Sequence, residues 1–126
     1  MLFELKSRKS LEEIGRGLEE SAARHQFGIV AVHDLKATMA KKGVSYEGDC
    51  MIYEVCNPHQ AKKVLEENGA ISVALPCRIS VYRAGEEFRI ATLLPTELLG
   101  LFQSTALDPV AEEVERVMVA MMRDAA

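Results

Sequence analysis

The densest group of chemically active side chains is the octapeptide YEVCNPHQ, residues 53–60. It places a carboxylate at Glu54, a thiol at Cys56 and an imidazole at His59. If the residues up to Cys56 form a strand, Glu54 and Cys56 share one face with their Cα atoms about 7 Å apart. Cys56 also precedes an expected helix start, where unpaired N–H groups favour anions and can lower a thiol pKa. A reactive thiolate, a metal ligand and a packing residue are therefore the three interpretations of Cys56.

Electrostatic magnitudes do not favour a reactive thiolate at Cys56 unless a further cation is present. The helix dipole contributes about 0.3–1 kcal/mol, which is less than one pKa unit. Glu54 opposes thiolate formation by a comparable amount, so the two effects cancel. The available cations are Arg78, Lys62 or a bound metal ion, and only the metal would also explain the carboxylate.

A metal site is the second interpretation. Glu54, Cys56 and Cys77, completed by His59 or His33, are ligand types that zinc or another transition metal accepts. The spacing lacks the second ligand pair of a structural zinc motif. A transition metal is thus the one cofactor that the sequence suggests. The competing explanation is that Cys56 and Cys77 are buried small hydrophobes, as free cysteines often are.

A thiol-dependent redox enzyme or sensor is an alternative. Cys56-Asn57-Pro58-His59 resembles the C-x-x-C of thioredoxin-like proteins in opening a helix with a proline inside the motif. Histidine replaces the resolving cysteine, and Cys50 is too far along the same strand to bond to Cys56 directly. No Ser-His-Asp order, glycine-rich phosphate loop or HExxH motif is present, so no catalytic residue is assigned.

The interpretation that uses most of these residues is a small binding pocket. Polar groups from Tyr53, Glu54, Cys56, Asn57 and Cys77 would converge on apolar walls, as in small-molecule sites. The ligand is a metal or a small molecule, and a homodimer interface is one place for such a pocket. The third alternative is a structural or interaction protein with buried cysteines.

Composition limits the class of protein. The chain of 126 residues is 48% hydrophobic and 27% charged, which predicts one globular domain over residues 1–126. Its net charge of −4 and pI of about 5.4 argue against nucleic-acid binding. No secretory signal or membrane-spanning run is present, and three cysteines without an export signal predict reduced thiols in the cytoplasm.

The amino-terminal half shows clear start and stop signals. Apolar and charged residues alternate over residues 2–6, which predicts a strand. Ser10 and Glu13 form a capping box, which predicts a helix to about residue 25. A strand over 27–32, a short helix capped by Asp34 and a strand over 49–56 follow.

A helix start is predicted at Asn57, a preferred N-cap residue, followed by Pro58 at the first helical position. Gln60 occupies the position of the reciprocal capping residue. This helix should turn Ala61, Val64 and Leu65 inward and end in a left-handed stop at Asn68-Gly69.

The carboxyl-terminal half predicts a hairpin followed by two helices. The odd residues from 73 to 81 are apolar, which predicts a strand over 73–82 with Cys77 on its buried face. Residues 84–85 make the turn to a strand ending before Pro95. Helices are expected over 96–103 and from Asp108-Pro109 to the end. The order predicts an α+β fold, a mainly antiparallel sheet with helices packed on one face.

One long segment carries a family resemblance. CNPHQAKKVLEENGAISVALPCRISVY, residues 56–82, contains Cys-Asn-Pro before a helix and Leu-Pro-Cys entering a strand. It resembles the signature region of domain-of-unknown-function family 302, and the order of elements matches along almost the whole chain. The resemblance implies a TATA-binding-protein-like arrangement of β-α-β-β-α-β-β-α type. It implies no activity, and His59 lies outside its pattern.

Overall fold

A computed structural model describes residues 1–126. Its centre is a five-stranded sheet with the spatial order β1-β5-β4-β3-β2, in which every neighbouring pair is antiparallel. The strands are β1 (Leu2–Ser7), β2 (Gly28–Asp34), β3 (Cys50–Cys56), β4 (Cys77–Ala84) and β5 (Glu87–Leu93). The predicted α+β class with a mainly antiparallel sheet is confirmed.

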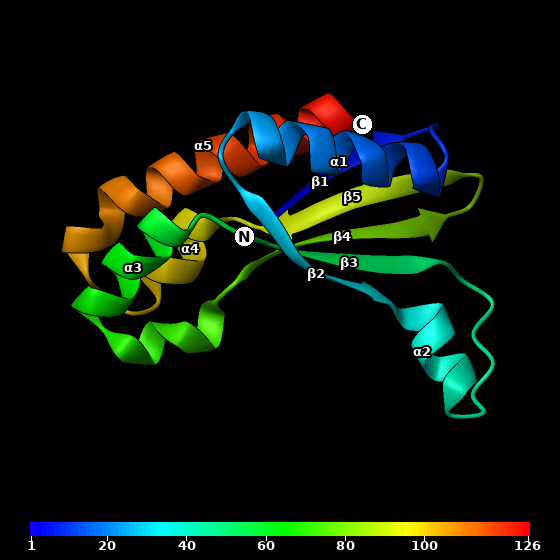
Figure 1. Ribbon diagram of the computed structural model, residues 1–126, viewed down its shortest axis with the longest axis horizontal. Coiled ribbons are helices and arrows are strands. Elements are labelled where there is room, and N and C mark those ends of the chain that lie inside the picture. The colour runs from blue at the N-terminus through cyan, green and yellow to red at the C-terminus, as the bar shows by residue number, and fades with distance from the viewer.

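Two long helices, α1 (Leu11–Arg24) and α5 (Asp108–Ala125), lie against each other across one face of the sheet (Figure 1). The remaining helices lie beyond the ends of the strands. At one end is α2 (Leu35–Lys41), and at the other are α3 (Pro58–Glu67), α4 (Pro95–Gly100) and two 3-10 helices, η1 (Gly69–Ala74) and η2 (Thr105–Leu107).

The main core fills the space between the two long helices and the sheet. Ile14 and Leu18 from α1, Met118 and Met121 from α5 and Ile90 from β5 are all fully buried. A second, smaller core lies under α3, η1 and α4, where Val64, Ile71 and Leu99 pack together. At about 25 cal/mol for each Å² of apolar surface removed from water, these two clusters are the main stabilising contribution to the fold.

The predicted start signals of the helices are present. The Ser10 hydroxyl accepts a hydrogen bond from the Glu13 N–H at 3.1 Å, and the Glu13 carboxylate accepts one from the Ser10 N–H at 3.1 Å. The Asp34 carboxylate accepts from the Ala37 N–H at 3.0 Å. Both helices therefore begin where their sequences indicate.

The end of α3 differs from the prediction. Asn68 has an extended backbone, with φ of −160°, and not the left-handed conformation expected at Asn68-Gly69. Its side chain accepts a hydrogen bond from the Ala70 N–H at 3.0 Å and so begins η1. Leu65, predicted to point inward, is 43% exposed.

The strand predicted over residues 73–82 begins later than expected. Residues up to Ala74 belong to η1, and β4 starts at Cys77 after a cis Leu75–Pro76 bond. The apolar residue Val73, counted as inward-facing in the predicted strand, is 84% exposed. The alternation is real from Cys77 onward, where Ile79 and Val81 are fully buried.

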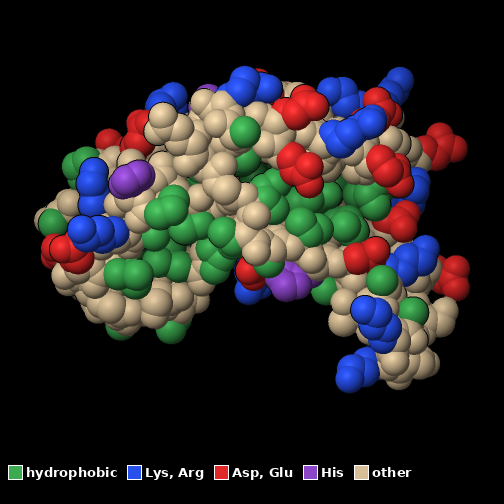
Figure 2. Space-filling view, in the orientation of Figure 1, with side chains coloured by type: hydrophobic (Ala, Val, Ile, Leu, Met, Phe, Trp, Pro, Cys, Tyr) green, Lys and Arg blue, Asp and Glu red, His purple; other side chains and the backbone are tan.

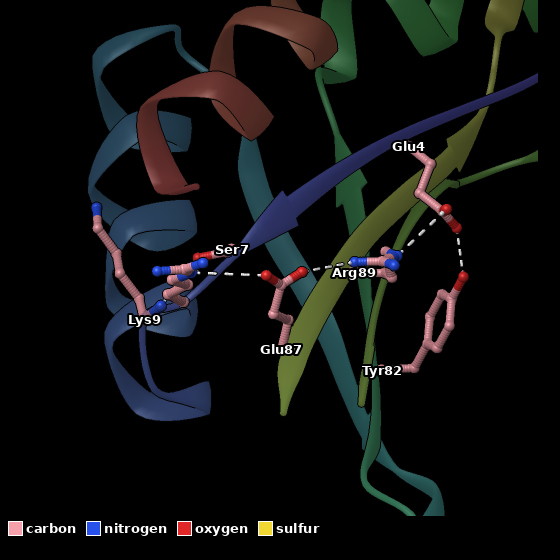
Figure 3. A network of polar contacts seen from close by, with 7 residues as sticks. Glu4, Ser7, Lys9, Tyr82, Glu87 and Arg89 are labelled. Carbon is pink, nitrogen blue, oxygen red and sulfur yellow. Dashed lines mark hydrogen bonds and ion pairs between the residues drawn. The ribbon is translucent and has the colours of Figure 1, made fainter. Parts of the chain in front are cut away.

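The sheet face opposite α1 and α5 carries polar side chains. Phe3 and Leu5 pack on the main core, so alternation directs Glu4 to the other face. Figure 3 shows the Glu4 carboxylate joined to the Tyr82 hydroxyl and to the Arg89 guanidinium, which in turn contacts Glu87 at 3.0 Å. These contacts link β1, β4 and β5 across this open face.

Candidate functional site

A cavity of about 340 Å³ lies where the ends of β3, β4 and β5 meet the helices α3, α4 and α5. Its walls are mainly apolar and include Val64 of α3, Leu75 after η1, Leu99 of α4 and Val114 of α5. This volume is at the lower end of the range of about 300–1,000 Å³ found for small-molecule sites. The cavity therefore has the size and lining of a site for a small molecule.

The start of α3 builds one wall of this cavity. The Asn57 side-chain oxygen accepts hydrogen bonds from the N–H groups of His59 at 3.0 Å and Gln60 at 3.4 Å. Pro58 occupies the first helical turn, where no N–H donor is needed. The chain thus passes directly from β3 into α3, and Cys56 and Asn57 both line the cavity at this junction.

Two of the three cysteines line the same cavity. Cys56 ends β3, Cys77 begins β4, and both belong to the cavity lining. Burial raises the pKa of both thiols, and that of Cys77 reaches about 11, with the neighbouring Cys56 adding to the rise. Both thiols are therefore protonated at neutral pH. A thiol-dependent reaction requires the opposite shift.

Glu54 does not join the two thiols. Its carboxylate lies 3.4 Å from His33 Nε2 and 3.3 Å from Arg78 Nη2, on the open face of the sheet. The register explains this separation. Glu54 is opposite Arg78 and Val55 is opposite Cys77, so alternation turns Glu54 and Cys77 to opposite faces.

Tyr53 is a core residue and does not line the cavity. It is 5% exposed and points toward α1, where a Cβ added at Gly15 would lie 2.6 Å from its Oη. Glycine at position 15 permits this close approach of helix and ring. Burial, with Glu19 and Glu12 nearby, raises the pKa of the Tyr53 hydroxyl.

The structure does not assemble the predicted metal ligands. Glu54 lies on the open face, Cys56 and Cys77 line the cavity, and His59 is exposed at the start of α3. No three His, Cys, Asp or Glu side chains come close enough to bind one metal ion. The remaining cysteine, Cys50, has its sulfur 3.9 Å from the Ser80 hydroxyl.

Three polar residues line the cavity without having been predicted to do so. They are Gln60, Arg78 and Thr92. Thr92 is 5% exposed, and its hydroxyl donates a hydrogen bond to the Arg78 carbonyl at 2.6 Å. A signal for Thr92 was available, since it follows Phe88 and Ile90 at the spacing of the inward face of β5.

Gln60 does not complete the reciprocal cap that was expected. Its Oε1 atom is buried and has no hydrogen-bond partner. An unsatisfied buried polar atom costs about 1–3 kcal/mol. The stability of the fold therefore does not explain Gln60, which also lines the cavity.

We expect Gln60→Leu to raise the free energy of unfolding by about 1 kcal/mol, because it replaces an unsatisfied amide by an apolar side chain of similar size. Urea denaturation measures the change. Lys63→Leu, at an exposed position of the same helix, should change stability by less than about 0.5 kcal/mol. A loss of stability in Gln60→Leu would mean that the amide is satisfied after all.

None of the helices is long and apolar enough to cross a lipid bilayer.

Comparison with known proteins finds a matching family model and a similar solved structure. The family model described as "Domain of unknown function DUF302" matches residues 3–125. The chain is also similar to a solved structure, the crystal structure of uncharacterized conserved protein DUF302 from Bacillus stearothermophilus. The TM-score is 0.93 at 28% sequence identity, over 99% of this chain and 98% of that one. The comparison with curated proteins finds no match. The fold and the family model agree with the signature at residues 56–82, and the chain belongs to the DUF302 family.

Proposed function

We propose that this protein is a binding module for a small, largely apolar molecule, held in the cavity between the strand ends and α3, α4 and α5. The observation that carries the proposal is the cavity itself, about 340 Å³ with mainly apolar walls. Small-molecule sites combine such walls with a few polar groups that orient the ligand. Here Asn57, Gln60 and Thr92 supply these groups.

The unpartnered amide of Gln60 supports a binding role over a purely structural one. A glutamine amide can both donate and accept hydrogen bonds, and rotation about its terminal torsion is soft. Rotation of this amide toward the cavity would satisfy it against a polar group of the ligand. Such a contact would offset the cost of burying Oε1 without a partner.

The size of the cavity sets the size of the ligand. A liquid water molecule occupies about 30 Å³, and a methylene group is of similar size. A cavity of about 340 Å³ therefore accommodates on the order of ten non-hydrogen atoms. An eight-carbon alcohol is a suitable probe, since it has an apolar body and one polar group.

We expect 1-octanol to bind to the wild-type protein and Ala61→Phe to weaken this binding about tenfold or more, because the larger side chain fills the cavity from α3. Isothermal titration calorimetry measures the affinity. Ala23→Phe, at an exposed position of α1, should leave it unchanged. Absence of octanol binding to the wild type, or equal binding by both variants, would reject the cavity as the binding site.

A further inference from the structure

No charged side chain is directed into the cavity. Arg78 is the only Lys, Arg, Asp or Glu among the lining residues. Its guanidinium contacts the Glu54 carboxylate at 3.3 Å on the open face of the sheet, whereas the next residue, Cys77, turns to the face that carries the cavity. The Arg78 atom tied to the cavity wall is its carbonyl oxygen, which accepts a hydrogen bond from Thr92. The side chains that face the cavity therefore carry no formal charge.

An uncharged cavity discriminates against ionised ligands. Burying a carboxylate or an ammonium group without an opposite charge costs far more than burying a hydrogen-bonded hydroxyl. Glu54 and Arg78 pair with each other on the open face, so neither offsets a charge inside the cavity. The thiols of Cys56 and Cys77 are protonated at neutral pH, because burial raises both of their pKa values. A ligand that fits this cavity is therefore uncharged.

Gln60 is the one uncharged polar side chain of the lining that the protein leaves without a hydrogen bond. Asn57 Oδ1 accepts from two backbone N–H groups of α3, and the Thr92 hydroxyl donates to a backbone carbonyl. Both side chains thus hold the cavity wall itself. The Gln60 amide lines the same wall, with Oε1 buried and unpartnered and with Nε2 free to donate. Such an amide can bind a group that both donates and accepts hydrogen bonds.

The cavity opens to the surface along an apolar rim. Val73 of η1 lines the cavity and is 84% exposed. Figure 2 shows hydrophobic side chains at the surface over the end of the molecule formed by α3, α4 and η1. A ligand entering here meets apolar side chains, and an ionised end group finds no opposite charge among the side chains that face it.

From this arrangement we propose that the ligand is a neutral amphipathic molecule, an alcohol or a carboxamide, whose polar end binds Gln60 while its apolar body fills the cavity. The proposal rests on the binding function above and names its ligand class. It makes Gln60 the residue that determines specificity. The body contains on the order of ten non-hydrogen atoms, as set by the cavity volume.

The charge of the ligand is tested with probes of equal chain length, namely 1-octanol, octanoate and octylamine. Isothermal titration calorimetry at pH 7.5, below their micellar concentrations, measures each affinity. We expect octanol to bind at least about tenfold more tightly than either ion, because only the ions lose hydration of a charge without gaining an opposite one. Octanoate or octylamine binding as tightly as octanol would overturn the assignment of a neutral ligand.

The role of Gln60 is tested with toluene as a second probe, since toluene has no polar group. We expect Gln60→Leu to weaken octanol binding about fivefold, the loss of one hydrogen bond, and to change toluene binding less than about twofold. Retained toluene binding also shows that the variant keeps its cavity. Lys63→Leu, at an exposed position of the same helix, is the matched control and should affect neither probe.

The binding function and the ligand class fail through different results. If neither octanol nor toluene binds to the wild type, the proposed function fails. If both bind but Gln60→Leu weakens them equally or weakens neither, the assignment of a neutral ligand held by Gln60 fails and the binding function stands.

Discussion

Iodoacetamide should alkylate Cys77 about a hundredfold more slowly in the folded protein than in the same protein unfolded in urea, at pH 7.5. Burial raises the pKa of this thiol from its usual 9.0 to about 11, which lowers the fraction present as thiolate by a factor of about a hundred. Only the thiolate reacts. The measurement uses the double variant Cys50→Ser/Cys56→Ala, in which Cys77 is the one remaining thiol and burial, the larger cause of its raised pKa, is retained. Equal rates in folded and unfolded protein would show that Cys77 is not buried and that its pKa is not raised.

The same shift predicts a pH dependence of stability with a definite sign. The folded protein keeps the Cys77 proton up to about pH 11, whereas the unfolded chain loses it near pH 9. The unfolded state therefore binds fewer protons between these values, and the free energy of unfolding falls as the pH rises from 9 to 11. The slope contributed by one thiol is at most about 1.4 kcal/mol per pH unit. Urea denaturation of Cys77→Ala across this range should show a flatter dependence, and identical curves would contradict the shift.

Leu18→Ala should lower the free energy of unfolding by about 3 kcal/mol, within the range of about 2–5 kcal/mol measured for such truncations in well-packed cores. Leu18 is fully buried between α1, α5 and the sheet. The substitution removes apolar contacts with α5 and the sheet and leaves a cavity in a closely packed core. Urea denaturation with a two-state fit measures the change.

Leu65→Ala is the matched control for this experiment, because it makes the same truncation in a helix at a side chain that is 43% exposed. It should cost less than about 1 kcal/mol, since a side chain in contact with water contributes little burial. Similar losses in both variants would mean that Leu65 is buried in solution, against the exposure that the structure gives it.

The parts of the fold that could be predicted are those with a local physical cause. The Ser10 and Glu13 capping box and the Asn57-Pro58 pair satisfy backbone groups within a few residues, so short sequence motifs are sufficient to identify them. The period of two from Cys77 onward likewise reflects one strand with one buried face.

The errors arose where a local pattern had a different cause. The alternating apolar residues before Cys77 suggested a strand, yet Val73 lies exposed beside the cavity in a 3-10 helix. Asn68-Gly69 was expected to end α3 through a left-handed backbone. The Asn68 side chain instead accepts a hydrogen bond from the Ala70 N–H and begins η1, because asparagine side chains commonly bond to nearby backbone groups.

The candidate site depends on relations between strands that one sequence does not specify. Alternation predicts that Glu54 and Val55 of β3 point to opposite faces of the sheet. The register between β3 and β4, which puts Val55 opposite Cys77, then decides that Cys77 shares the face of Val55 and not that of Glu54. Without that register, Glu54 and Cys77 could be assigned to one site. The cavity itself depends on how strand ends and three helices meet in space, and only that meeting places Gln60 and Thr92 in one wall.

The pairing of β1 with β5 has a consequence for how the chain folds during synthesis. Leu2 lies opposite Leu93, so the first strand cannot complete its ladder until most of the chain has been made. Ribosomes add about 5–20 residues per second, which leaves β1 without its partner for on the order of ten seconds. Such long-range pairing raises the contact order and slows folding. The strand β1, whose apolar residues alternate with Glu4 and Lys6, therefore stays unpaired until β5 emerges.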